Sequence, residues 1–311
     1  YEDVTSVDSV GVVTARGLSI FGNTTGLNAG VSTFTADIAV NSISIGKGAN
    51  SVSGNTAVGE SALDAAVTGG SNTAFGRNTL TANTSGASNT GIGKDALESN
   101  STGSQNTAVG ANALAANTTA NNNTAVGTNA LEENTTGDQN TAVGRDALEA
   151  NTTAAGNSAF GYNTLASNTT GTRNTAVGSL ALDAITTTND NTAIGYGALT
   201  ASTTGQNNTA VGRSALATST TGSNNTAVGR LAMSNADVTG DNNVAIGYQG
   251  LYANTTGYHN NAMGTNSLVA NTTGNNNSAL GSDTLKTNTT GSHNVAIGLN
   301  ALETNNADNN I

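Results

Sequence analysis

The feature that most constrains the fold is a repeat of 17 residues. Asn106 to Gln139 holds two consecutive copies, N-T-A-V-G-A-N-A-L-A-A-N-T-T-A-N-N and N-T-A-V-G-T-N-A-L-E-E-N-T-T-G-D-Q. The opening Asn, which we number position 1, recurs fifteen times between Asn55 and Asn294, always 17 residues apart except for 18 residues between Asn225 and Asn243. A fixed period of this length indicates a solenoid, in which each turn, here called a coil, packs only on its neighbours.

The residue types within the unit favour strands over helices. Asn, Thr and Gly at fixed places are poor helix formers, whereas Thr107-Ala108-Val109 suits a short strand. Gly110 and Asn112 suit one corner and Asn117-Thr118-Thr119 the other, because Gly and Asn tolerate left-handed backbone angles. We therefore expect two short strands per coil. About fifteen coils, stacked in parallel at about 4.8 Å, would extend roughly 70 Å.

Proline is absent from all 311 residues. In a solenoid nearly every backbone N–H donates to the next coil, and proline has no N–H to give. The recurrent Asn can also stack its side-chain amides into a ladder. Both observations predict an all-β, parallel β-solenoid.

Two positions of the unit are large and apolar. Position 4 is Val, Ile, Phe, Met or Leu in every coil, and position 9 is Leu except at Met233. We expect both positions to form the coil core, as represented by Val58, Leu63, Val109, Leu114, Val126, Leu131, Val143 and Leu148.

Position 3 is Ala in fourteen coils and Gly91 in the other. On a strand it faces away from position 4, so we expect it outside, where a residue kept this small indicates close packing against an identical chain around a threefold or twofold axis. The alternative is that Ala is simply tolerated on a narrow outer face. The predicted trimer interface comprises Ala57, Ala74, Ala108, Ala125, Ala142, Ala176, Ala193, Ala210 and Ala227.

Composition excludes several classes of protein. With 3% aromatic and 9% charged residues, the chain lacks the material for two ordinary globular cores. Without cysteine it has no disulfide framework or thiolate metal site, and its net charge of −11 argues against nucleic acid as a partner. No apolar run is long enough for membrane insertion. Because the sequence starts at Tyr1 without Met, we expect a fragment or a processed product.

The chain divides into three segments. Residues 1–40 lie outside the repeat and predict a strand-rich stem or connector. Residues 41–306 are the predicted solenoid, with Asn41 to Gly46 as a first, shorter coil, and residues 307–311 are expected to be a polar tail.

Catalytic and metal-binding motifs are not apparent in the sequence. His259 and His293 are two coils apart, about 10 Å at the usual strand spacing, which is too far to share a metal ion. We therefore expect no enzyme activity and no cofactor. Exposed aromatic rings can stack on sugars, so the candidates for glycan contact are Tyr162, Tyr196, Tyr248, Tyr252 and Tyr258. The alternative is a freely variable solvent corner, since position 6 also holds Arg145 and Arg213.

The unit N-T-A-V-G-x-x-A-L-x-x-N-T-T-G resembles repeats of bacteriophage tail fibres and of trimeric autotransporter adhesin heads. The resemblance covers residues 41–306 and implies a left-handed parallel β-roll assembled as an intertwined homotrimer. The opening segment, with D-V-T-S-V-D-S-V-G-V-V, is similar to connectors of virion fibre proteins, which favours a phage over a bacterium. The unit here is longer than that of the adhesin head, so one corner differs.

Three functions follow from these observations. The first is a virion tail fibre shaft, extracellular, that spaces or presents binding to a host-surface glycan or protein. The second is a bacterial cell-surface adhesin or extracellular filament subunit. The third is an ice-binding solenoid, since Thr recurs in the N-T-T corners, although a flat array would require T-x-T within a strand.

Overall fold

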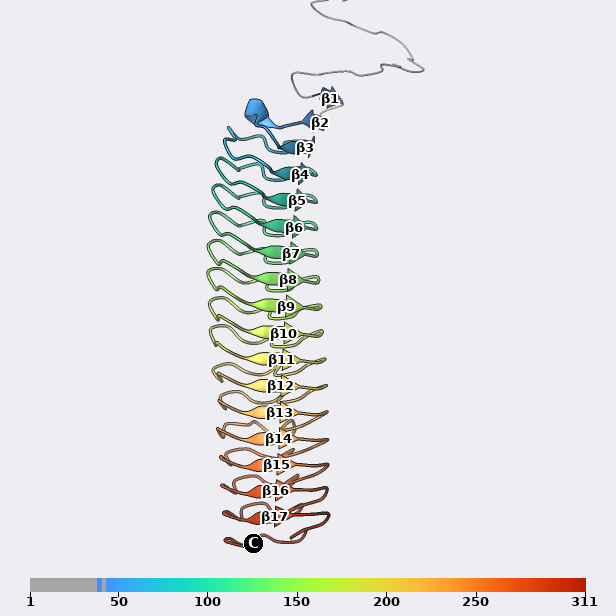
Figure 1. Ribbon diagram of the computed structural model, residues 1–311, viewed down its shortest axis with the longest axis vertical. Helices are drawn as coiled ribbons and strands as arrows, with labels where there is room; N and C mark the ends of the chain where they lie inside the picture. The colour runs from blue at the N-terminus through green and yellow to red at the C-terminus, as the bar shows by residue number, and fades with distance from the viewer. Residues whose placement is uncertain (1–37, 41–42) are drawn as a thin grey trace, which may run out of the picture. The chain divides into compact units, whose positions relative to one another are not determined.

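A computed structural model describes residues 38–40 and 43–311 (Figure 1). The predicted stem, residues 1–40, lies outside the described residues except for its last three. Ala36–Ile311 forms one compact unit, separate from Tyr1–Thr35. The elements are β1 (Ile38–Val40), β2 (Ile43–Gly46), η1 (Ala49–Ser51), β3 (Thr56–Gly59), β4 (Thr73–Phe75), β5 (Thr90–Ile92), β6 (Thr107–Val109), β7 (Thr124–Val126), β8 (Thr141–Val143), β9 (Ser158–Phe160), β10 (Thr175–Val177), β11 (Thr192–Ile194), β12 (Thr209–Val211), β13 (Thr226–Val228), β14 (Val244–Ile246), β15 (Asn261–Met263), β16 (Ser278–Leu280) and β17 (Val295–Ile297).

Strands β3 to β17 stack in chain order into one parallel sheet (Figure 1). Each position pairs with the same position of the next coil, as when Ala108 pairs with Ala125 and Val109 with Val126. The 18-residue coil keeps this register, because Ala227 pairs with Ala245. The predicted parallel β-solenoid with 17-residue spacing is therefore confirmed.

The prediction of two strands per coil is wrong, because the second side of each coil consists of turns. Asn112 at position 7 and Leu114 at position 9 have φ of 57° and 52°, in the left-handed region that a strand cannot contain. Backbone bonds still link the coils there: the N–H of Leu114 donates to Ala130 O at 3.0 Å. A left-handed Leu costs about 1–2 kcal/mol, and its full burial, worth about 1.5–3 kcal/mol, offsets that cost.

The interior of each coil contains positions 3 and 9. Leu63, Leu114, Leu131 and Leu148 are fully buried, which confirms the predicted burial of the Leu column. The left-handed backbone turns position 9 toward the same side as position 3, so Leu131 and Ala125 belong to one buried cluster.

Two predictions about the strand faces are consequently wrong. The nine alanines assigned to the trimer interface, Ala57, Ala74, Ala108, Ala125, Ala142, Ala176, Ala193, Ala210 and Ala227, are fully buried inside their own chain. The four valines assigned to the coil core, Val58, Val109, Val126 and Val143, lie outside and are half-buried or exposed. The physical reason is that the coil is narrow: Leu at position 9 fills it and leaves room for only a methyl group at position 3.

A ladder of asparagines at position 1 confirms the predicted stacking of amides. The backbone N–H of Asn123 donates to Asn106 Oδ1 at 3.0 Å, and its side-chain Nδ2 donates to Gly137 O at 2.8 Å across the coil. The N–H of Asn140 in turn donates to Asn123 Oδ1 at 2.8 Å. Each Asn therefore joins its own coil to both neighbours and satisfies buried backbone groups.

Position 12 carries a second ladder. Asn134 Nδ2 donates to Asn117 Oδ1 at 3.0 Å and to Gly137 O at 3.1 Å. This ladder is interrupted after Asn168, because the next coil has Ile185 at position 12, which has no donor, and it resumes at Asn254, whose Oδ1 accepts from Asn271 Nδ2 at 3.0 Å. Asn168 Oδ1 and Ser202 Oγ, on either side of Ile185, are both buried without a hydrogen-bond partner.

Both ends of the stack differ from the sequence prediction. Strand β2, expected to belong to a first coil, runs antiparallel to β3, with Ile45 opposite Val58. At the other end, residues 307–311 continue the stack instead of forming a tail. Asn310 takes the place of a repeat Asn: its N–H donates to Asn294 Oδ1 at 2.9 Å, and its O accepts from the N–H of Val295 at 2.8 Å.

Candidate functional site

The outer surface of the parallel sheet is the most distinctive surface of the described solenoid. Alternation along each three-residue strand turns positions 2 and 4 outward and position 3 inward. We call the position 4 side chains the apolar column, those of position 2 the threonine column, and the two together the outer face. The apolar column consists of Val58, Phe75, Ile92, Val109, Val126, Val143, Phe160, Val177, Ile194, Val211, Val228, Ile246, Met263, Leu280 and Ile297.

The apolar column is open to solvent in the single chain. Phe75 is 56% exposed, Val126 37%, Phe160 41% and Leu280 48%. No charged residue occurs at positions 2 or 4 of strands β3 to β17, although positions 6 and 10 of the same coils carry Arg, Lys and Glu. Monomeric soluble proteins rarely expose continuous apolar patches of more than a few hundred Å². A stripe along fifteen stacked strands is therefore unusual for the surface of a single chain.

The outer face has a depression in its last three coils. Met263, Leu280 and Ile297 line a depression of about 220 Å³, together with Val295 and Ser278 of the neighbouring column. Position 2 is Thr in ten of the fifteen coils but Val244, Asn261, Ser278 and Val295 in the last four. The outer face is thus most regular in its first eleven coils.

The five tyrosines predicted for glycan contact do not form one site. Tyr162 and Tyr248 each have an arginine of the preceding coil over the ring, with Arg145 Cζ 5.8 Å and Arg230 Cζ 5.7 Å from the ring centroids. Tyr196 is 54% exposed at the same position 6, Tyr252 is half-buried, and Tyr258 is 45% exposed at another corner. Four of the five tyrosines are therefore exposed, but they do not share one location.

Charged groups of the solenoid lie at corners and form local pairs. Arg173 Nε donates to Asp190 Oδ1 at 2.7 Å, and this hydrogen bond lowers the pKa of Asp190. Burial, followed by repulsion from Glu133 and Asp146, raises the pKa of Glu132. Burial together with the carboxylates of Asp146, Glu132 and Glu133 likewise raises the pKa of Glu149.

Within residues 38–40 and 43–311, no group of three or more His, Asp or Glu side chains could hold a metal ion. No helix in that part of the chain is long and apolar enough to cross a membrane. His259 lies beside Asn242, with its Nε2 3.5 Å from Asn242 Nδ2.

The exposure of the apolar column was missed from the sequence, although a signal was present. Position 3 admits only Ala and Gly91, whereas position 4 admits five different apolar residues. Strict size restriction is typical of a packed interior, and tolerance of size is typical of a less constrained surface.

A scan of protein-family models and a search of curated proteins found no match to this chain. Its function is therefore inferred from the outer face and from the architecture of the coils.

Proposed function

We propose that this chain is a structural fibre protein whose coils assemble as a homotrimer through the outer face. The observation that carries the proposal is the uncharged apolar column, which is half-buried or exposed along strands β3 to β17. Within this proposal the protein is the extracellular shaft of a virion tail fibre, which spaces or presents a host-binding element. A bacterial surface adhesin is the alternative, since the repeat resembles both classes.

A second copy of the chain is the partner that best fits the outer face. Its own apolar column rises by the same strand spacing, about 4.8 Å per coil, so the two columns stay in register along their whole length. Around a threefold axis, three columns would meet and form a core between the chains. Half-exposed aliphatic side chains would each add about 1 kcal/mol, roughly half of the value for full burial.

The interior of the coils is suited to a shaft. Backbone bonds and the asparagine ladder at position 1 connect each coil to the next, and the second ladder and threonine hydroxyls add to them in many coils; Thr118 Oγ1, for example, donates to Thr135 O at 3.0 Å. Each coil is stabilised mainly by its neighbours, as in other solenoids. Such a stack keeps its length under load without a large hydrophobic core.

The native mass of the chain, measured by light scattering, tests this proposal. We expect three times the 30.5 kDa of one chain. Replacing Val109, Val126 and Val143 by Glu should lower the mass to that of one chain while the β-sheet circular dichroism is retained, because a charge at a closely packed interface is costly.

The matched control places the same three charges in the same coils at exposed corners, as Thr119→Glu, Thr136→Glu and Thr153→Glu. It should leave the trimer intact. A single-chain mass for the wild type, or an unchanged mass for the valine variants, would rule the proposed assembly out.

An ice-binding function is the second candidate, and the threonine column favours it. Ten regularly spaced threonines beside an apolar column form a flat, repetitive, uncharged surface. The threonines of the N-T-T corners do not add to this surface, because hydroxyls such as that of Thr118 donate to the next coil. If the protein is a single chain in solution, thermal hysteresis of a dilute solution decides whether this candidate holds.

A further inference from the structure

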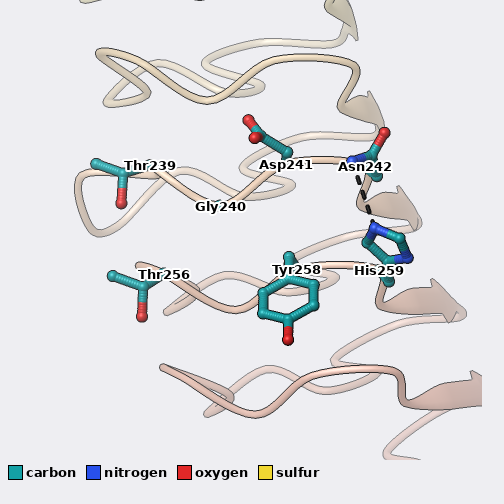
Figure 2. A pocket seen from close by; sticks show the side chains of 7 residues that line it. All are labelled: Thr239, Gly240, Asp241, Asn242, Thr256, Tyr258 and His259. Atoms are coloured by element: carbon teal, nitrogen blue, oxygen red, sulfur yellow. Dashed lines mark hydrogen bonds between the residues drawn. The ribbon is translucent and has the colours of Figure 1, made fainter.

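A hollow of about 270 Å³ lies at the corner that precedes the strands, beside the 18-residue coil. Its lining is the seven residues labelled in Figure 2, and we call it the tyrosine hollow. Figure 2 shows Thr239 and Thr256 on one side, Asp241 and Tyr258 on the other, and Gly240 between them. The corner sequence here is Val238-Thr239-Gly240, shorter than Asn254-Thr255-Thr256-Gly257 of the next coil, so two unlike corners are stacked.

The ring of Tyr258 is exposed and held in place. It is 45% exposed, and His259 packs against it edge-on, with 5.3 Å between the ring centroids and 88° between their planes. His259 in turn contacts Asn242 in the coil above (Figure 2). A fixed, accessible aromatic ring loses little side-chain freedom when a ligand stacks on it.

Tyr258 also interrupts a ladder of hydrogen bonds at position 16. In many of the other coils, though not where this position is Ala87 or Ala155, its side-chain oxygen accepts the N–H of position 16 in the preceding coil, as when Asn275 Oδ1 accepts from Tyr258 N at 2.9 Å. Asp241 Oδ1 accepts in the same way from Ser223 N at 2.7 Å. The only side-chain oxygen of Tyr258 is the hydroxyl at the far end of its ring. The backbone N–H of Asp241 therefore lacks the side-chain acceptor that Asn275 provides for Tyr258 N. The hollow therefore presents the Asp241 N–H on the side of Tyr258, while the Asp241 carboxylate points toward the preceding coil (Figure 2).

We propose that the tyrosine hollow binds the pyranose ring of a neutral sugar. The apolar C–H face of a sugar stacks on the Tyr258 ring, while an adjacent hydroxyl accepts from the Asp241 N–H. The hydroxyls of Thr239 and Thr256 line the opposite side of the hollow. The Asp241 carboxylate and the net charge of −11 disfavour an acidic sugar.

This site goes beyond the proposed fibre function. It lies at positions 14 to 17, whereas assembly uses positions 2 and 4, so each can fail without the other. Tyr162 and Tyr248 do not offer the same arrangement, because an arginine lies over each ring. Tyr196 is more exposed than Tyr258 but sits at position 6, away from this interrupted ladder, and is the matched control.

Saturation-transfer NMR on the full chain tests the site. The probes are the methyl glycosides of glucose, galactose, mannose and N-acetylglucosamine, with glucuronate as the acidic comparison. We expect transfer to the ring protons of at least one neutral probe, and weaker transfer to glucuronate. Tyr258→Ala should reduce the affinity about tenfold or more, since stacking and its aligned hydrogen bonds are lost together. Asp241→Asn should bind the probe as the wild type does, because this side chain points toward Ser223 and its Oδ1 can still accept from Ser223 N.

Tyr196→Ala should bind the probe as the wild type does, and the native mass of Tyr258→Ala should be unchanged. The site is excluded if none of the four neutral probes receives saturation, if glucuronate receives more than they do, or if Tyr258→Ala and Tyr196→Ala behave alike. A native mass of the wild type below that of three chains would contradict the fibre proposal. It would not affect the result for the sugar site.

Discussion

Positions 3 and 4 of the repeat are neighbours in the same strand, yet they face opposite environments. Ala125 at position 3 is fully buried, and Val126 at position 4 is 37% exposed. The small residue is inside and the large apolar residue is outside, the reverse of an ordinary globular strand. A narrow solenoid therefore admits only small side chains at the strand position that faces its interior. Its larger apolar strand residues lie outside, where another molecule can contact them.

The two columns also differ in what they tolerate. The interior accepts Ala or, at Gly91 only, Gly; an added Cβ at Gly91 would lie 2.5 Å from Thr79 Cγ2. The outer column accepts both Val126 and the much larger Phe75 and Phe160. The interior is therefore fixed by packing within one chain, and the outer column needs only to remain apolar.

The largest expected effect comes from the asparagine ladder that closes the interior. Asn123→Ala removes the acceptor of the buried Asn140 N–H, while Gly137 O loses one donor and keeps Asn134 Nδ2 as the other. At about 1–3 kcal/mol for the unsatisfied N–H and about 1 kcal/mol for the lost hydrogen bond to Gly137 O, we expect a loss of up to about 4 kcal/mol in the free energy of unfolding. Urea denaturation measures it, with the exposed Thr136→Ala as the control expected to change little. A loss below about 1 kcal/mol for Asn123→Ala would contradict the role given to the ladder.

A pair of substitutions compares the two columns directly. Ala125→Leu forces three extra carbons into the packed coil and should cost about 3 kcal/mol. Val126→Leu adds one carbon on the exposed side and should cost less than about 0.5 kcal/mol. Thermal and urea unfolding of both variants provide the measurement. Equal costs, or a larger cost at Val126, would reverse the assignment of inside and outside.

The gap in the second ladder offers a finer test of the interior. Ile185→Asn loses about 1.5–3 kcal/mol of apolar burial, but it supplies a donor to Asn168 Oδ1 and an acceptor for Ser202 Oγ, both unpaired now. We expect a net change within about 1 kcal/mol. Leu182→Asn, in the same coil but away from the ladder, should cost more than about 3 kcal/mol. The ladder account does not hold if the two Asn variants are equally unstable in urea.

The smallest effect concerns charge at the corners. Because burial and the neighbouring Glu133 and Asp146 raise the pKa of Glu132, its ionised form opposes folding above that raised pKa. Glu132→Gln should therefore raise the free energy of unfolding at pH 7 by less than about 1 kcal/mol. The gain should vanish as the pH falls below the ordinary value of 4.5, where Glu132 is protonated in both states. A gain that persists in acid would indicate a cause other than charge.

Much of the fold follows from the sequence. The 17-residue period, the parallel in-register stacking, the burial of Leu131 and the ladder through Asn123 were all predictable, because periodicity and the need to pair every backbone group determine them. The inside and outside of the strand were not. Alternation places Ala125 and Val126 on opposite faces, but it does not say which face is inner when both residues are apolar.

The missing information lies in the backbone of the turns. The left-handed conformation of Leu131, φ 53°, directs position 9 toward position 3, and a bulky residue in that region is not anticipated from propensity. The tyrosine hollow depends on a corner one residue shorter than its neighbour, so the exposed tyrosines alone did not locate it.

Oxidative and bis-maleimide cross-linking of a single cysteine tests the proposed assembly through the outer face most directly. The chain has no cysteine, so Val126→Cys introduces one thiol per chain in the middle of the apolar column. If the outer faces of identical chains meet, Val126→Cys should yield covalent species of two and three chains, whereas Thr136→Cys at an exposed corner should not. Single chains only from Val126→Cys, or the same products from both variants, would contradict assembly through this face.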